Sequence, residues 1–204
     1  MNLLITGGAG YIGSHVARQL SEQGDSVTVF DNLSTGSREA LLYSEKLIHA
    51  DLADEKALTE AVSNGRFDAV LHFAASIVVP ESVSDPLKYY SNNTANTLRL
   101  IKACVDYGIE KFIFSSTAAV YGMPDSGYAD ETTPPAPMNP YGASKLMSEQ
   151  ILRDTSLAHG LKYVVLRYFN VAGADPLLRM GQRTPNATHL IKVCCQAALG
   201  LRDR

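Results

Sequence analysis

The chain has 204 residues, 46% of them apolar, which suffices for the core of one α/β domain and part of a second. A net charge of −3 argues against nucleic acid or a membrane surface as its main partner. No apolar run reaches the roughly 18 residues of a transmembrane helix, and Met1 leads into a strand-like run without a signal peptide, so we expect a soluble, cytoplasmic protein.

The three cysteines do not predict a metal site. Cys104, Cys194 and Cys195 are an odd number, and they show no spacing typical of zinc ligands. Because a free cysteine commonly behaves as a small buried hydrophobe, we expect all three to be packing residues.

A glycine-rich turn follows the first strand-like run. Residues 3–5 predict a strand, and Gly7, Gly10 and Gly13 follow it in the sequence. The apolar spacing that resumes at Ile12 predicts a helix. At the start of such a helix, backbone N–H groups attract an anion, and missing Cβ atoms let a pyrophosphate approach. The strand and helix patterns on either side favour this interpretation over a glycine-rich turn without a ligand.

An acidic residue ends the second strand-like run. Residues 26–30 lead into Asp31, whose carboxylate can accept hydrogen bonds from the ribose hydroxyls of a dinucleotide and would repel a 2′-phosphate. This favours NAD over NADP. Arg38, in the following loop, offers the opposite preference, because an arginine there accommodates the phosphate. Asp51 ends the third expected strand, where its carboxylate can meet the adenine amino group.

Strands and helices alternate along the rest of the chain. We expect further strands over residues 46–50, 68–73, 111–115 and 162–168, and helices over residues 54–64, 87–107, 141–158 and 188–199. This succession predicts an α/β fold, a Rossmann-type doubly wound parallel sheet with helices on both faces and ligands at the carboxyl ends of the strands. The proline-rich run 130–137 predicts a loop that borders the site.

Tyr141 and Lys145 are the candidate base and its cation. They lie four residues apart and project from one face of the expected helix. A tyrosine has an unperturbed pKa of about 10, and a fixed positive charge nearby is one way to stabilise its phenolate. Ser115 and Thr117 follow the fifth strand, where a hydroxyl can bond a substrate oxygen and pass its proton to Tyr141, or can simply end the strand.

Together, these motifs resemble the extended short-chain dehydrogenase/reductases. Those that carry the resemblance occur in the order and spacing of that family: Thr6-Gly7-Gly8-Ala9-Gly10-Tyr11-Ile12-Gly13, Asp31-Asn32-Leu33, His72-Phe73-Ala74-Ala75, Ser115-Ser116-Thr117, Tyr141 with Lys145, and Leu166-Arg167-Tyr168-Phe169-Asn170. Within the family, the chain is most similar to the 4-epimerases of nucleotide sugars, and the match runs from Met1 to the end.

The resemblance implies roles for individual residues. Tyr141 and Lys145 would form the catalytic base, with Thr117 at the family's Ser/Thr position. The implied NAD site consists of Gly7, Gly10, Tyr11, Ile12, Gly13, Asp31, Asn32, Asp51, Leu52, Phe73, Ala74, Ala75, Asn92, Ser115, Tyr141, Lys145 and Phe169. The implied UDP-sugar site consists of Thr117, Tyr141, Asn170, His189 and Leu190. Epimerases often carry a lysine where Ile77 stands, so the cofactor contact of that lysine is not expected here.

The implied reaction is NAD-dependent epimerisation at C4 of a UDP-hexose, such as UDP-glucose or UDP-galactose, through a 4-keto intermediate. Related dehydratases and decarboxylases carry acidic groups directly after the Thr, whereas this chain has Ala118 and Ala119, whose methyl groups transfer no proton. Two alternatives remain. One is a nucleotide-sugar reductase or dehydrogenase with net redox, and the other is a non-catalytic NAD-sensing protein, against which the intact Tyr141, Lys145 and Thr117 argue.

The resemblance also implies a homodimer formed through helices 87–107 and 141–158. Apolar positions beyond a single core-facing stripe support this expectation. They are Tyr89, Tyr90, Leu100, Met147 and Leu157.

The motifs divide the chain unevenly. All cofactor motifs lie before residue 171, so we expect residues 1–170 to form an NAD-binding domain and residues 171–204 to begin a substrate lobe that is truncated relative to the family. Such a chain should bind NAD but turn over its sugar slowly, because little remains to exclude water from the reaction.

Overall fold

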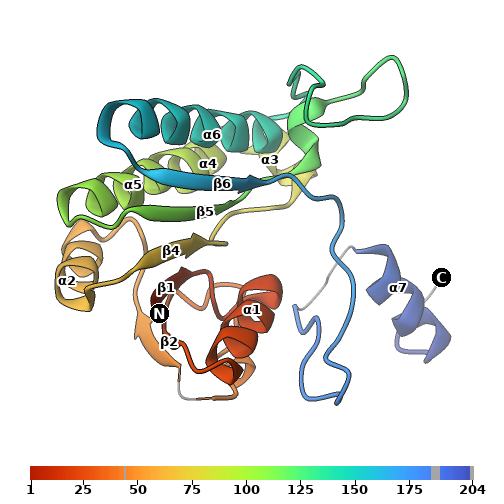
Figure 1. Ribbon diagram of the computed structural model, residues 1–204. Coiled ribbons are helices and arrows are strands. Elements are labelled where there is room, and N and C mark those ends of the chain that lie inside the picture. The colour runs from red at the N-terminus through yellow and green to blue at the C-terminus, as the bar shows by residue number, and fades with distance from the viewer. Residues whose placement is uncertain (44, 185–188, 203–204) are drawn as a thin grey trace.

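A six-stranded parallel sheet forms the centre of the computed structural model, which describes residues 1–43, 45–184 and 189–202. The strand order is β3-β2-β1-β4-β5-β6, with all neighbours parallel (Figure 1). The strands are β1 (Asn2–Thr6), β2 (Ser26–Asp31), β3 (Lys46–His49), β4 (Ala69–His72), β5 (Lys111–Ser115) and β6 (Lys162–Leu166). The predicted Rossmann-type sheet is therefore confirmed, and its sixth strand ends two residues earlier than expected.

The helices follow the predicted order, except that one is interrupted and a short helix over residues 79–84 was not predicted. They are α1 (Tyr11–Glu22), α2 (Glu55–Gly65), α3 (Val79–Ser84), α4 (Pro86–Tyr89), α5 (Asn96–Asp106), α6 (Pro140–His159) and α7 (Leu190–Ala198). Short 3₁₀ turns occur at η1 (Arg38–Ala40) and η3 (Ala118–Tyr121). Residue 188, where the last helix was expected to start, lies outside the described residues. None of the described helices is long and apolar enough to cross a membrane.

The helix expected over residues 87–107 is instead three segments, because a π-helical stretch, η2 (Tyr90–Ala95), joins α4 to α5. Asn93 in this stretch is buried, and its amide needs partners. It accepts from Ser76 N at 2.8 Å and donates to Ser76 O at 2.9 Å and to Ser144 Oγ at 3.1 Å. The wider π-helical turn thus directs the buried amide of Asn93 toward Ser76 and Ser144.

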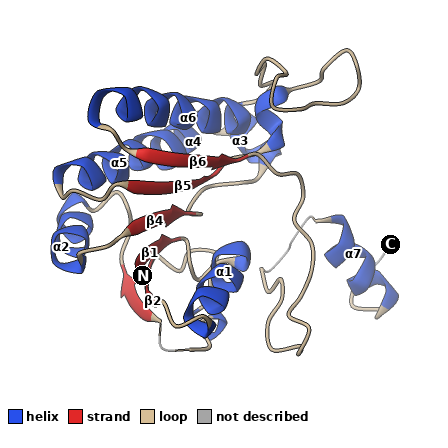
Figure 2. Ribbon diagram, in the orientation of Figure 1, coloured by secondary structure: helices blue, strands red, loops and turns tan. Residues whose placement is uncertain are grey.

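The two faces of the sheet are covered unequally. Helices α2, α5 and α6 pack on one face, against Leu4, Val70 and Phe112, whereas α1 packs on the other (Figure 2). The α1 face of β6 is less covered, since Val164 is 53% exposed. Helices on both faces were predicted and are present, but within the described residues the cover on the α1 side stops short of β6.

The cysteines divide into two kinds. Cys104 is buried in the core, where burial raises the pKa of its thiol to about 12, as expected of a packing residue. Cys194 and Cys195 are exposed on α7, so the expectation that they pack is wrong. This helix has no buried residue among those described.

A buried ion cluster fastens the segment after β6 to α1. Arg18 of α1 donates from Nη1 to Asp175 Oδ1 at 2.5 Å, and Arg179 Nε donates to Asp175 Oδ2 at 2.7 Å. Arg18 and Asp175 are both almost fully buried. Close by, the Tyr11 hydroxyl donates to Gly173 O at 2.6 Å. The segment is therefore held against α1 by ion pairs and by a hydrogen bond.

Asp175→Asn tests this cluster. Hydrogen bonds from Arg179, aided by the charge of Arg18, hold the pKa of the Asp175 carboxyl well below its usual range. A depressed pKa contributes stability that is complete above the unfolded value of about 3.9 and is lost as pH falls through the folded value. We expect the variant to unfold at lower urea than the parent at pH 7, because the buried Arg18 charge loses its 2.5 Å partner and keeps, among the described residues, only Glu22, 3.7 Å away.

The difference in unfolding midpoint between parent and variant should shrink as pH falls below about 4. Asp154→Asn, which removes an exposed carboxylate from α6, is the control and should leave the midpoint unchanged. Equal midpoints for parent and Asp175→Asn at pH 7 would show that the cluster does not stabilise the fold.

Candidate active site

The predicted site residues gather at the carboxyl ends of the strands. Gly7 to Gly13 follow β1, Asp31 ends β2, Ser115 ends β5, and Tyr141 lies in the first turn of α6. Figure 1 shows these strand ends pointing toward the same side of the sheet. This is the edge at which parallel α/β folds bind ligands.

The glycine turn allows close contact between three backbone segments. Gly7 has φ +72°, and a Cβ there would lie 2.4 Å from Ala74 N, which follows β4. A Cβ on Gly13 would lie 2.2 Å from Gly7 O. Gly10 is the N-cap of α1 and supplies no side-chain cap, so the first N–H groups of the helix keep their capacity for an anion.

Asp31 fastens this turn to the end of β2. Its side chain is buried, with Oδ2 accepting from Ala9 N at 2.9 Å and Oδ1 accepting from Leu33 N at 2.8 Å. Each carboxylate oxygen keeps further acceptor capacity for a ribose hydroxyl. Nearby, Asn32 Nδ2 donates to Asp51 Oδ2 at 2.6 Å, which joins two of the residues predicted around the adenosine. Arg38 is exposed on η1.

Tyr141 and Lys145 lie four residues apart on α6, and Thr117 follows the end of β5. Asn139 caps α6 by accepting from Gly142 N at 2.9 Å, which fixes the turn that carries Tyr141. The Thr117 hydroxyl accepts from Ala119 N at 3.1 Å, and it lies near enough to the Tyr141 phenol to lower the pKa of that phenol.

The Lys145 ammonium is buried at the carboxyl end of β5. Its side chain is buried, and Nζ donates to Ser115 O at 2.8 Å. Nζ also lies 4.9 Å from the centre of the Phe114 ring, whose face attracts a cation. These contacts hold Lys145 against the end of β5.

Burial dominates the acid–base properties of the pair. It raises the pKa of Tyr141, and the Thr117 hydroxyl opposes this rise. It lowers the pKa of Lys145 to about 7, and the charge of Glu149 opposes this fall. The sequence suggested that a fixed charge on Lys145 stabilises the phenolate. In the structure, burial outweighs any such effect, because both charged forms lose contact with water.

Other predicted cofactor residues follow β3 and β4 or lie on neighbouring helices. Phe73, Ala74 and Ala75 follow β4, Leu52 is buried after β3, and Asn92 donates from Nδ2 to Ser76 Oγ at 2.9 Å. Tyr11 and Ile12 open α1.

The segment after β6 approaches the same centre. Ala118 N donates to Tyr168 O at 3.0 Å, and the Tyr168 hydroxyl is hydrogen-bonded to Ser115 Oγ. Phe169 and Asn170 follow and are exposed. Sequence reasoning gave Tyr168 no role of its own, although its place in the Leu166–Asn170 motif at the end of the expected sixth strand was a usable signal.

Two predicted substrate residues lie elsewhere. His189 and Leu190 begin α7, which stands apart from the sheet in Figure 1. His189 Nδ1 is 2.7 Å from Gln182 Nε2, and Leu190 is 75% exposed. The structure does not bring them to Tyr141, and their role stays a prediction.

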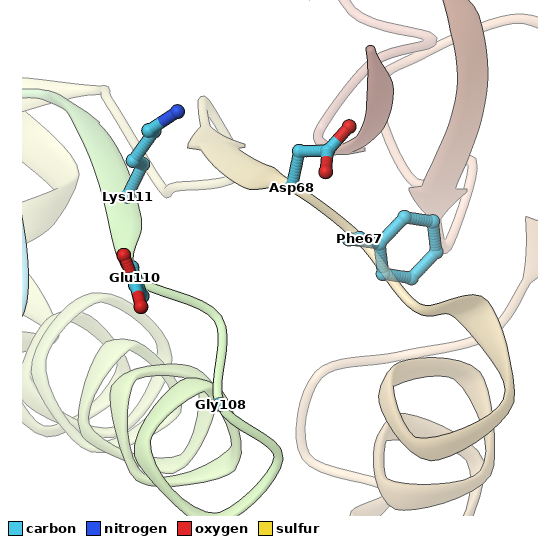
Figure 3. Close-up of a pocket in the computed structure, with 5 residues that line it drawn as sticks. All are labelled: Phe67, Asp68, Gly108, Glu110 and Lys111. Carbon is cyan, nitrogen blue, oxygen red and sulfur yellow. The ribbon is translucent and has the colours of Figure 1, made fainter.

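A hollow at the opposite edge of the sheet is not part of this site. It lies near the starts of β4 and β5 and is lined by Phe67, Asp68, Gly108, Glu110 and Lys111 (Figure 3). Asp68 already accepts from Asn2 N at 2.7 Å, which joins β1 to β4. Its place at the amino ends of the strands separates it from the candidate catalytic residues.

Comparison with known proteins gives relatives along the whole chain. A UDP-glucose 4-epimerase from Azospirillum brasilense is 58% identical over 200 residues, which are 98% of this chain and 58% of the relative. The crystal structure of a UDP-glucose 4-epimerase from Brucella ovis in complex with NAD has a TM-score of 0.96 at 44% identity and covers 99% of this chain and 62% of that one.

A third relative is a UDP-glucose 4-epimerase from Bifidobacterium longum, solved in complex with NAD⁺ and UDP. Its TM-score is 0.94 at 35% identity, and it covers 100% of this chain and 64% of that one. This chain therefore spans less than two thirds of the length of these relatives. The model of the NAD dependent epimerase/dehydratase family matches residues 3–201. The chain belongs to that family.

Proposed function

We propose that this chain takes part in NAD-dependent epimerisation at C4 of a UDP-hexose, with UDP-glucose and UDP-galactose as the substrate pair. The observation that carries the proposal is the arrangement of Thr117, Tyr141 and Lys145 beside the glycine turn at one edge of the sheet. The names of the relatives support the choice of reaction. The cytoplasmic location expected from the sequence stays a prediction.

The residues of the turn fit a dinucleotide. A Cβ at Gly7 or Gly13 would collide with neighbouring backbone atoms. The first turn of α1 has no side-chain cap. We propose that this turn holds the pyrophosphate and that Asp31 accepts from the adenosine ribose. When bound, NAD supplies the hydride chemistry.

Side chains of the protein itself transfer the proton of the sugar hydroxyl. We propose that the Tyr141 phenolate takes the proton of the sugar 4-hydroxyl and later returns it, with Thr117 donating to the same oxygen. Lys145 then stabilises the phenolate as an ammonium beside Ser115. Ala118 and Ala119 carry no proton to transfer, which argues against a dehydratase. We further propose residues 1–170 as the cofactor domain and residues 171–204, with Asn170, as part of the sugar site.

An assay with UDP-galactose and no added cofactor tests the reaction. We expect the purified chain, loaded with NAD and then freed of unbound cofactor, to form UDP-glucose slowly. Tyr141→Phe should lower this rate by at least about a hundredfold while NAD binding persists. Tyr128→Phe, at a tyrosine that is 71% exposed in a loop, is the matched control and should keep the parent rate.

Each alternative gives another result in this assay. A reductase or dehydrogenase with net redox would convert sugar only with external cofactor and would accumulate the other redox form. An NAD-sensing protein would bind NAD and convert nothing. An unchanged rate in Tyr141→Phe would remove Tyr141 from the mechanism.

Asp31→Ala tests the cofactor preference. Losing a charged acceptor should weaken NAD binding about tenfold or more, and losing the negative charge should relax the rejection of NADP. Isothermal titration with both cofactors measures the two affinities. Asp125→Ala, at an exposed loop position, is the control. A parent that already prefers NADP would show that Arg38 determines the preference instead.

We also propose a homodimer through α4, α5 and α6. Met147 and Leu157 are exposed on α6, which supports an apolar contact surface, whereas Tyr89 and Leu100 are buried within the subunit and do not contribute as expected. Tyr90 is partly buried. Sedimentation at micromolar concentration should give a dimer, and Met147→Glu should shift it toward monomer, because a buried charge in the contact is costly. A monomeric parent contradicts the proposal.

A further inference from the structure

Glu149 lies one turn after Lys145 on α6 and is almost fully buried. Oε1 accepts from the Ser116 hydroxyl and from Arg167 Nε at 3.1 Å. Oε2 accepts from Arg167 Nε at 3.1 Å and from Nη2 at 2.5 Å. The Arg167 guanidinium lies 4.9 Å from the centre of the Tyr121 ring. This carboxylate is thus bonded on both oxygens, to two different segments.

These partners are placed next to the candidate active-site residues. Ser116 stands between Ser115 and Thr117, and Arg167 directly precedes Tyr168. Glu149 itself is on the helix that carries Tyr141 and Lys145. One side chain therefore links the end of β5, the end of β6 and α6. The backbone reinforces this link, since Ser116 N donates to Leu166 O at 2.9 Å.

The charges around Lys145 give Glu149 a second effect. On α6, Lys145 has Tyr141 on one side and Glu149 on the other. From β4, His72 is fully buried, and burial together with Lys145 lowers its pKa to about 3, so it is neutral at pH 7. From the strand ends come the carbonyl of Ser115 and the phenol of Tyr168, which is hydrogen-bonded to Ser115. Among the described residues, Glu149 is the carboxylate whose charge acts on Lys145.

We propose that Glu149 is a positioning residue of the candidate active site. It ties the Ser115–Thr117 segment and the Arg167–Asn170 segment to α6, and its buried negative charge favours the ammonium form of Lys145. The inference deepens the proposed function, because a charged Lys145 is what the Tyr141 phenolate requires. Arg167 holds the Glu149 carboxylate in place through a bidentate contact, and its guanidinium lies on the ring of Tyr121.

The first experiment measures the charge effect without cofactor or substrate. The side-chain nitrogen of Lys145 is followed by NMR across pH in ¹⁵N-lysine protein and is assigned by its loss in Lys145→Met. The parent should titrate with a pKa of about 7. In Glu149→Gln, which keeps the length of the side chain but loses its charge, the Lys145 pKa should fall by about one unit. Asp154→Asn, which removes an exposed charge from the same helix, should leave it unchanged.

The second experiment measures how firmly Glu149 holds the Ser115–Thr117 segment. It does not require that the Glu149→Gln variant folds. Ser116→Ala removes one hydrogen bond from Glu149 and leaves its charge. Amide hydrogen exchange at Ala118, whose N–H donates to Tyr168 O, should become about fivefold faster or more, while exchange at Ile113 within β5 stays as in the parent. The Lys145 titration in this variant should match the parent.

The two experiments separate this inference from the proposed function. Identical Lys145 titration in the parent and Glu149→Gln, or unchanged exchange at Ala118 in Ser116→Ala, overturns the role of Glu149 even if the chain epimerises UDP-galactose. The expected shifts in both variants support that role even if the chain proves to bind NAD without turnover.

Discussion

The burial of the Lys145 ammonium is the constraint on which the site depends. An ammonium removed from water needs hydrogen-bond acceptors and nearby negative charge, or it loses its proton. Here the acceptor is the carbonyl of Ser115, the last residue of β5. The end of β5, paired with β4 and β6 on its two sides, is a rigid acceptor, so the geometry of the sheet determines where the cation can lie. The ring of Phe114 from the same strand adds an attractive face.

The same strand ends restrict the backbone of the glycine turn. Gly7 and Gly13 are required because the backbone is too crowded there for a Cβ atom. The backbone segments that meet are the end of β1, the start of α1 and the segment after β4. Asp31 joins this turn to β2 through Ala9 N. The close approach and the buried carboxylate together make an edge with free helix N–H groups and one negative charge, which suits a dinucleotide with an unmodified adenosine ribose.

Local patterns predicted most of the fold and the centre of the site. The strands, the glycine turn and the Tyr141–Lys145 face depend on residues close in sequence, so their spacing was informative. The π-helical stretch at Asn93, the Arg18–Asp175 pair and the contact of Glu149 with Arg167 join residues far apart along the chain, and no local period marks them. The exposure of Cys194 and Cys195 depends on how α7 lies against the rest of the fold, which the local apolar pattern does not indicate.

Burial acts against charge on both members of the Tyr141–Lys145 pair, since it raises the pKa of the phenol and lowers that of the ammonium. A dry site would therefore hold the pair neutral. The Thr117 hydroxyl opposes this effect at the phenol, and the charge of Glu149 opposes it at the ammonium. Thr117 and Ser116, the partner of Glu149, are adjacent residues. The short segment after β5 therefore connects both groups that favour the charged pair, which makes its position decisive for the proposed chemistry.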